Sequence, residues 1–243
     1  MKYLIFDIET VPLAWDNFSE SQQEYLTRNA STEEEIAKKK NEMGLSPLTA
    51  QVVCIGMQLM ESGENNQNEM ISRAALSVDN SLKDGEKREE QLSTGDTCIF
   101  YNEKTLLDTF WKIMTKYHPV HLISFNGRNF DAPFLMMRSA LLGIRPSKNI
   151  MSGTKFNYQW HTDLIDELTF FSPSFGYGAT KRFNFDFYTR AFGLTSPKSE
   201  EINGSLVPEF FAEGRIMEIS EYCLRDVTAT WELFLIWKEF LHF

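Results

Sequence analysis

The chain has 243 residues, of which 42% are hydrophobic, including 20 phenylalanines. This is enough apolar material for one sizeable core, so the composition excludes a chain that is disordered throughout. The formal net charge of −10 argues against a broad electrostatic grip on a long nucleic-acid duplex and favours short, local contacts.

The cysteines and the first residues indicate a compartment. Cys54, Cys98 and Cys223 are odd in number and lack metal-ligand spacing, which is typical of free thiols in a reducing environment. The chain does not start with the basic and apolar regions of a secretory signal, and no apolar run reaches transmembrane length. We therefore expect a cytoplasmic protein without a membrane partner.

The first predicted strand, residues 2–8, is an apolar run that leads into Asp7 and Glu9. Because side chains alternate between the faces of a strand, the two carboxylates share one face near its end. Such close anions repel each other and lose hydration on burial, and Mg²⁺ or Mn²⁺ would resolve the conflict. The alternative is a strand that ends in two solvated acids, and this segment alone does not decide between them.

The middle of the chain changes from polar to alternating elements. A mostly polar helical stretch is predicted over residues 18–43, and its charges at 33–40 are typical of a solvated helix face. We interpret the polar residues 62–97 as a mobile insertion with one short strand at 69–73. The other predicted elements are strand 51–61, strand 98–101, helix 103–117, strand 120–124 and helix 131–142. This order predicts a single α/β domain over residues 1–243, with a mixed β-sheet flanked by α-helices.

Two later segments add polar residues of interest. Asp131 follows a turn rich in Asn and Gly and precedes Pro133, which taken alone is an ordinary helix start with Asp as the cap. Near the C-terminus, apolar residues recur at helical spacing, and Tyr222 and Asp226 are four apart, so they share one helix face. Cys223 lies about 100° further round that helix, so we expect Cys223→Ser to leave activity nearly intact.

Together, Asp7-x-Glu9, Asn126-Gly-x-x-Phe130-Asp131 and Tyr222-x-x-x-Asp226 resemble the three motifs of the DEDD superfamily of ribonuclease-H-like 3′–5′ exonucleases. Tyr222, four residues before Asp226, makes this third motif similar to that of the tyrosine subclass. The histidine subclass has a His five residues before the Asp, and Glu221 occupies that position here. Within that subclass the chain looks most like the proofreading exonuclease domain of family B DNA polymerases. The resemblance extends from residue 1 to about residue 237.

The resemblance implies a ribonuclease-H-like sheet and a metal-dependent exonuclease that acts on single-stranded 3′ ends. It would favour DNA over RNA and release nucleoside monophosphates by a two-metal mechanism. Two divalent cations, Mg²⁺ or Mn²⁺, would be held by Asp7, Glu9, Asp131 and Asp226. Tyr222 would orient the attacking water, and the backbone near Ile8 and Thr10 and the side chains of Asn126 and Phe130 would lie beside the 3′-terminal nucleotide.

Two further contacts with nucleic acid are candidates. Residues 170–192 interleave aromatic residues with Lys and Arg, a pattern that binds single strands, although we expect most of these aromatics to fill a helical core. Tyr177 is the exception, because flanking glycines indicate an exposed loop. Lys198 follows Pro197 in a loop, where it would meet a phosphate or be an ordinary surface lysine.

Two alternatives remain at this stage. One is a catalytically silent nucleic-acid-binding or scaffold module of the same fold. The other is a phosphotransferase of the haloacid-dehalogenase type. Residues Asp7-Ile-Glu-Thr-Val11 of this chain are similar to the nucleophile motif of that class. That class requires an Asp where Glu9 stands and an acidic pair downstream, for which Asp163 and Asp166 are the nearest approach. Protein partners are not indicated.

Overall fold

The computed structural model describes residues 1–63, 67–154, 156–172, 178–196 and 202–242. In these residues, seven strands form one mixed sheet in the order β4-β5-β3-β2-β1-β6-β7. The strands are β1 (Lys2–Pro12), β2 (Ala50–Ser62), β3 (Asn68–Val78), β4 (Arg88–Gln91), β5 (Thr97–Tyr101), β6 (His121–Ser124) and β7 (His161–Asp163). β1 lies in the interior of the sheet, antiparallel to β2 and parallel to β6.

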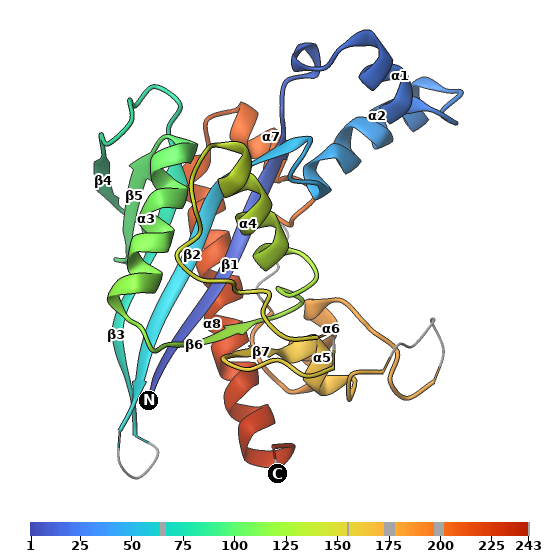
Figure 1. Cartoon of the computed structure of the whole chain (residues 1–243). Coiled ribbons are helices and arrows are strands. Elements are labelled where there is room, and N and C mark those ends of the chain that lie inside the picture. The colour runs from blue at the N-terminus through green and yellow to red at the C-terminus, as the bar shows by residue number, and fades with distance from the viewer. Residues whose placement is uncertain (64–66, 155, 173–177, 197–201, 243) are drawn as a thin grey trace.

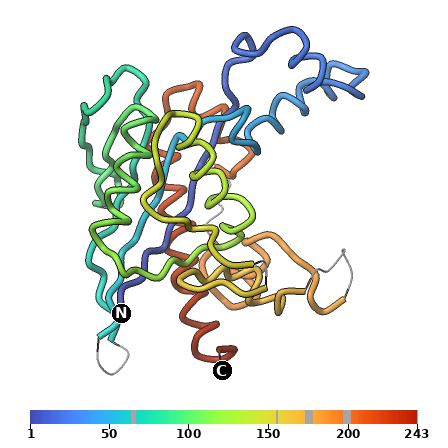
Figure 2. The backbone as a smooth tube through the Cα atoms, viewed as in Figure 1, coloured from blue at the N-terminus to red at the C-terminus, as the bar shows by residue number. Residues whose placement is uncertain are grey.

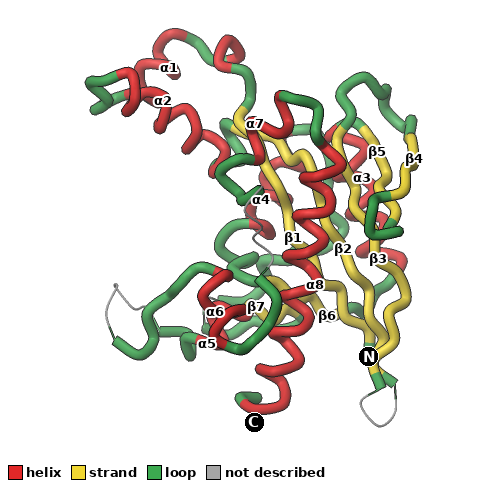
Figure 3. The backbone as a smooth tube through the Cα atoms, turned by 180° about the vertical axis from the view of Figure 1, so that it is seen from behind, coloured by secondary structure: helices red, strands yellow, loops and turns green. Residues whose placement is uncertain are grey.

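Helices cover both faces of this sheet. The helices are α1 (Glu20–Thr27), α2 (Glu33–Glu42), α3 (Glu103–Lys116), α4 (Asp131–Leu141), α5 (Leu164–Leu168), α6 (Phe185–Ala191), α7 (Val207–Ala212) and α8 (Ile216–Phe240). α3 and α4 lie on one face (Figure 1), and the long α8 crosses the opposite face (Figure 3). The predicted α/β fold is therefore confirmed. None of the helices in the described part of the chain combines the length and apolar character that spanning a bilayer requires.

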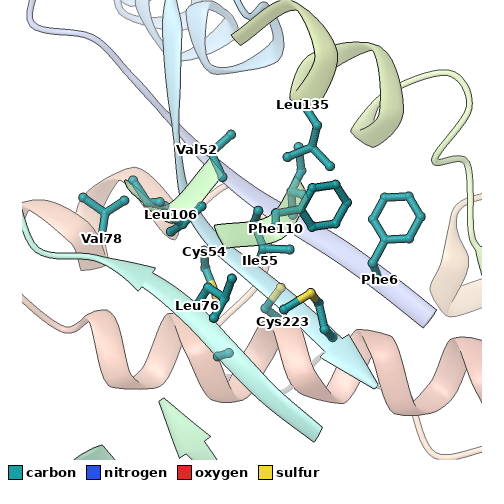
Figure 4. Packing of buried hydrophobic residues seen from close by; sticks show 14 of the residues in the cluster. Phe6, Val52, Cys54, Ile55, Leu76, Val78, Leu106, Phe110, Leu135 and Cys223 are labelled. Atoms are coloured by element: carbon teal, nitrogen blue, oxygen red, sulfur yellow. The ribbon is translucent and has the colours of Figure 1, made fainter. Parts of the chain in front are cut away.

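β1 is buried on both faces, which explains its nearly continuous apolar sequence. On the α3 side, the ring of Phe6 lies 6.0 Å from that of Phe110 (Figure 4). On the α8 side, the Tyr3 ring lies 5.4 Å from that of Phe234. Because the strand has a period of two, Asp7 and Glu9 point to the same face as Tyr3, toward α8.

The observed boundaries of β1 differ from those that the sequence predicts. The predicted strand at 2–8 continues to Pro12, because Asp7 and Glu9 lie within the ladder, opposite Gly56 and Cys54 of β2. The chain shifts register by a bulge between Glu9 and Thr10. A bulge re-aims side chains and increases local twist, so the two acids lie at a distorted part of a buried strand.

The segment predicted as a mobile insertion, residues 62–97, instead supplies two strands. The short strand expected at 69–73 is part of the 11-residue β3, which pairs with β2 along its length. The first half of β3 is largely exposed and polar, so it resembles a loop in sequence, whereas Ala75–Val78 is buried. β4 is exposed throughout and pairs with β5 at the edge of the sheet. Each of these polar segments is held as a strand by antiparallel pairing with its neighbour in the chain, β3 with β2 and β4 with β5.

The predicted helical stretch at 18–43 is two helices, not one. Ser19 and Thr32 each form a capping box, with Gln22 and Glu35 respectively, so two separate helix starts are satisfied. Neither α1 nor α2 contains a buried residue, and together they form an arm that projects beyond the sheet (Figure 2). A 3-10 turn, Met43–Leu45, leads the arm back to β2.

Candidate functional site

Two carboxylates and a thiol meet where β1 faces α8. One oxygen each from Asp7 and Glu9 and the Sγ of Cys223 lie within 4.8 Å of one another. Glu9 is only 8% exposed, although nothing in its sequence position marks it as a core residue. A largely buried cluster of potential ligands, in which Asp7 is partly exposed, is therefore assembled from two elements that are far apart in the chain.

A tight turn delivers Asp131 to the same cluster. After β6, Asn126 adopts a left-handed conformation with φ 64°, and α4 then begins at Asp131. Asp131 is 4% exposed, and its Oδ1 accepts a hydrogen bond of 2.9 Å from the backbone N–H of Ile8. The cap of α4 is Phe130, so the interpretation of Asp131 as the helix cap is wrong. Its carboxylate is turned to β1 instead.

Gly127 and Asp163 shape this turn. A Cβ at Gly127 would lie 2.3 Å from the Oγ of Ser124, so the close approach of the turn to β6 requires glycine. The Asp163 carboxylate accepts hydrogen bonds from the backbone N–H groups of Asn126, at 2.6 Å, and Arg128, at 2.8 Å. Asp163 therefore positions the turn that carries Asp131, a role that its sequence context did not reveal.

α8 contributes Tyr222 and Asp226 on one face, as their spacing predicts. Burial is the largest cause that raises the pKa of the Tyr222 hydroxyl, followed by the negative charges of Asp226, Glu9 and Asp7. A hydrogen bond between Tyr222 and Asp226 raises the same pKa further. The hydroxyl thus remains protonated at neutral pH, directly beside the acids.

The negative charge of each acid makes it harder for the neighbouring acids to lose their protons, and burial adds to this effect. Burial raises the pKa of Asp7 well above its usual range, and the charges of Asp131, Asp226 and Glu9 raise it further. Burial and the charge of Asp226 do the same to the pKa of Glu9. Burial raises the pKa of Asp131 to about 7, although the Ile8 N–H opposes this shift. Four acids from β1, α4 and α8 therefore share one electrostatic site.

This donor set fits divalent cations of the hard type. Mg²⁺ and Mn²⁺ prefer carboxylate oxygens, and a cation would offset the repulsion that raises these pKa values. The contact that lowers the pKa of Asp7 is a hydrogen bond from the Cys223 thiol, not a basic side chain. The carboxylate of Asp7 thus lies among negative charges whose effect on its pKa this one hydrogen bond offsets only in part.

Cys223 lies closer to the acids than its position on the helix suggests. Its thiol is 3.6 Å from Asp7 Oδ2 and 3.4 Å from the Asp7 carbonyl oxygen, and its Sγ accepts a 3.2 Å hydrogen bond from the Gly56 N–H. A Cβ at Gly56 would lie 2.9 Å from this sulfur, so glycine allows α8 to approach β2. Cys223 therefore contacts Asp7 although it lies about 100° round the helix from Tyr222, and the expectation that Cys223→Ser leaves activity nearly intact stays a prediction.

The predicted nucleic-acid contacts divide into three groups. Ile8, Thr10 and Phe130 line a cleft of about 750 Å³ that adjoins Glu9. Asn126 belongs to the turn before α4, where its N–H is held by Asp163. Tyr177 and Lys198 lie outside the described residues.

The aromatic residues before and within α6 do not form a helical core, contrary to our expectation for most of them. Phe170 is 68% exposed and Phe187 is 57% exposed, and Phe183 and Phe192 are also exposed. Phe185 and Tyr188 are half-buried and pack on Phe125. Since α6 is only seven residues long, it buries one narrow face and leaves the other aromatic rings at the surface.

Comparison with known proteins identifies the family. A family model described as "Predicted 3'-5' exonuclease related to the exonuclease domain of PolB" matches residues 66–241. The chain belongs to this family. The matched range begins after β1, so Asp7 and Glu9 lie outside it, whereas Asp131, Tyr222 and Asp226 lie within it. A search of curated proteins found no match.

Among solved structures, the chain is similar to the family B DNA polymerase from the hyperthermophilic archaeon Pyrobaculum calidifontis, with a TM-score of 0.53 and 18% identity. The match covers 99% of this chain and 25% of the polymerase, so the chain spans a quarter of that protein's length. At this identity the likeness shows the fold alone, and it confirms the ribonuclease-H-like fold and the resemblance to the polymerase exonuclease domain. The phosphotransferase alternative is set aside, because Asp163 binds backbone and Asp166 pairs with Arg182.

Proposed function

We propose that the chain is a divalent-metal-dependent 3′–5′ exonuclease that hydrolyses single-stranded nucleic acid, DNA in preference to RNA, to nucleoside monophosphates. The observation that carries this proposal is the convergence of four carboxylates and one tyrosine hydroxyl from β1, α4 and α8 beside an open cleft. Membership of a family of predicted 3′–5′ exonucleases supports the same reaction class. The three buried free thiols support a reducing, cytoplasmic location.

Asp7, Glu9, Asp131 and Asp226 would hold two ions, Mg²⁺ or Mn²⁺. Bound there, these ions supply a water of lowered pKa and neutralise charge on the phosphodiester. The charges of all three other acids raise the pKa of Asp7, so a cation bound among these acids would also interact with Asp7. The Ile8 N–H holds the Asp131 carboxylate in place, so this ligand is oriented before a metal or a strand binds.

Tyr222 has the role of positioning the attacking water. Its raised pKa makes it a poor base at neutral pH, and its hydrogen bond to Asp226 keeps the hydroxyl beside a carboxylate that would bind a metal ion. A protonated hydroxyl in this place can donate or accept one hydrogen bond and so fix the direction of a water molecule. The cleft beside Glu9 would receive the 3′-terminal nucleotide, with Phe130 against its base.

The deciding experiment uses a 5′-labelled single strand with a free 3′ hydroxyl and Mn²⁺ or Mg²⁺. We expect a ladder that shortens from the 3′ end, no cleavage of the same strand with a 3′ phosphate, and no cleavage by Asp7→Ala. Matched DNA and RNA strands would give the sugar preference. Immediate release of the label as a mononucleotide, or cutting of circular strands, would exclude 3′–5′ polarity. Binding without any cleavage would instead support a catalytically silent module.

A further inference from the structure

We propose that the arm formed by α1 and α2 is part of the substrate site, and that Lys38 on α2 binds a backbone phosphate of the single strand next to its 3′-terminal nucleotide. This inference rests on the proposed function, since it names a further positioning residue for the same substrate. It concerns a segment that the sequence marks only as a solvated helix and that lies outside the matched family range.

The cleft beside Glu9 is bounded by the arm as well as by the sheet. One side is the end of β1 with Ile8, Glu9 and Thr10, and Phe130 lies beside it. The other side is formed by α2 and the 3-10 turn after it, and Gly204, Ser205 and Pro208, before and within α7, complete the lining. The volume of about 750 Å³ is within the range of small-molecule sites and suits a nucleotide. The arm therefore faces the reacting end of a bound strand.

The arm is attached to β1 directly after the acids. The Thr10 Oγ1 donates a 2.7 Å hydrogen bond to the carbonyl oxygen of Gly44, and the Thr49 Oγ1 donates a 2.6 Å bond to that of Met43. The Leu13 N–H also donates to the Thr49 carbonyl oxygen. These bonds tie both ends of the arm together beside Glu9. The far wall of the cleft is thus held by the same strand that carries the candidate metal ligands.

The chemistry of this wall suits a single-stranded nucleic acid. Leu45 is 67% exposed, and with Phe130 and Pro208 it gives the cleft apolar surface on which bases stack irrespective of sequence. Lys38 is the one basic residue among the described residues that line the cleft, which otherwise contains acids such as Glu34 and Glu42. Among the described lining residues, Lys38 is therefore the one basic side chain that a phosphate in this cleft would meet.

The three adjacent lysines of α2 have different environments. The Lys39 Nζ lies 2.8 Å from Glu42 Oε2, and the Lys40 Nζ lies 4.4 Å from the centre of the Trp15 ring. Lys38 instead lines the cleft. Successive residues of a helix point about 100° apart, so one residue of a lysine run faces a given surface. Lys39 therefore offers a control of equal charge on the same exposed helix.

The test measures binding separately from cleavage. Lys38→Gln, Lys38→Arg and Lys39→Gln are made in an Asp226→Asn background, which lacks one proposed metal ligand, and the anisotropy of a fluorescein-labelled oligo-dT strand is followed with increasing KCl. We expect Lys38→Gln to weaken binding about 3- to 10-fold. The salt slope, which is the slope of the logarithm of the binding constant against the logarithm of the KCl concentration, should become about 0.7 less steep, the value for one phosphate contact on a single strand. Lys38→Arg should keep both the affinity and the slope, and Lys39→Gln should change the affinity less than about twofold.

The outcomes separate this inference from the proposed function. Equal affinities and equal salt slopes for Lys38→Gln and Lys39→Gln would overturn the role of Lys38, even if the unsubstituted protein degrades the strand. Loss of binding in Lys38→Gln with no exonuclease activity in the unsubstituted protein would leave the Lys38 contact intact and remove the catalytic function. Absence of binding in every variant, together with no degradation of the strand by the unsubstituted protein, would overturn both. Circular dichroism on each variant verifies that α2 is retained.

Discussion

Replacing Asp7 by Asn should make the metal-free protein more stable and the metal-loaded protein less stable. The carboxylate oxygens of Asp7 and Glu9 lie within 4.8 Å. At an effective dielectric constant of about 20, two charges at that separation repel by about 3 kcal/mol. Asp7→Asn removes this repulsion but keeps the size of the side chain. We therefore expect the free energy of unfolding in EDTA to increase by about 1–3 kcal/mol above about pH 7.

The pH dependence of this gain follows from the raised pKa of Asp7. A carboxyl whose pKa is raised by folding contributes stability that is fully present below the unfolded pKa of about 3.9 and is lost as the pH rises through the folded pKa. Asn imitates the neutral acid at every pH. The advantage of Asp7→Asn over the unsubstituted protein should therefore be absent at about pH 4 and grow toward about pH 8.

Urea unfolding followed by circular dichroism, in EDTA and in Mn²⁺, measures both effects. In Mn²⁺ the order should reverse, because an ion that binds only the native state stabilises the unsubstituted protein by mass action. Asp108→Asn is the control, since Asp108 is a partly exposed acid on α3 that pairs with Lys112. It should change stability by less than about 0.5 kcal/mol in either buffer. Equal destabilisation of Asp7→Asn in EDTA and Mn²⁺ would mean that Asp7 is a structural residue, and the reasoning would fail.

Three further predictions concern the same site. Because the pKa of Asp131 is raised to about 7, Mn²⁺ should raise the melting temperature more at about pH 8 than at about pH 6, as protons stop competing with the metal. Tyr222→Phe should lower single-turnover cleavage about 10- to 1000-fold, because the water loses its orienting group, but keep the stabilisation by Mn²⁺. Cys223→Ala should weaken Mn²⁺ binding about 10-fold in calorimetric titrations, because Asp7 loses a hydrogen bond that lowers its pKa, whereas Cys223→Ser keeps a donor there.

Each of these has a contrary result. A stabilisation by Mn²⁺ that is constant between the two pH values would show that no acid of raised pKa binds the metal. Cleavage by Tyr222→Phe at the unsubstituted rate would make Tyr222 a packing residue and remove the basis for the tyrosine-type role. Equal Mn²⁺ affinities of Cys223→Ala and the unsubstituted protein would show that the thiol only fills space beside Asp7.

Much of the framework is determined by local sequence patterns. The apolar run of β1 and the two-residue period put Asp7 and Glu9 on one face, because alternation depends only on the backbone of the strand itself. The four-residue spacing of Tyr222 and Asp226 puts them on one face of α8 for the same kind of reason. The helix starts at Ser19 and Thr32 are also determined locally, because each capping box involves residues only three positions apart.

Other features were decided only when distant segments packed. The local sequence around Asp131 predicts only a helix start, and the resemblance to the exonuclease motifs points to a metal ligand; the hydrogen bond from the Ile8 N–H, 123 residues away, depends on the tertiary fold. Cys223 reaches Asp7 because Gly56, 167 residues away, leaves room for α8. The parallel pairing of β3 with β5 and the cleft wall formed by α2 likewise depend on neighbours that no local pattern specifies. The periods of helices and strands determine which face of its own element a residue occupies. Which other segment packs against that face depends on the tertiary fold.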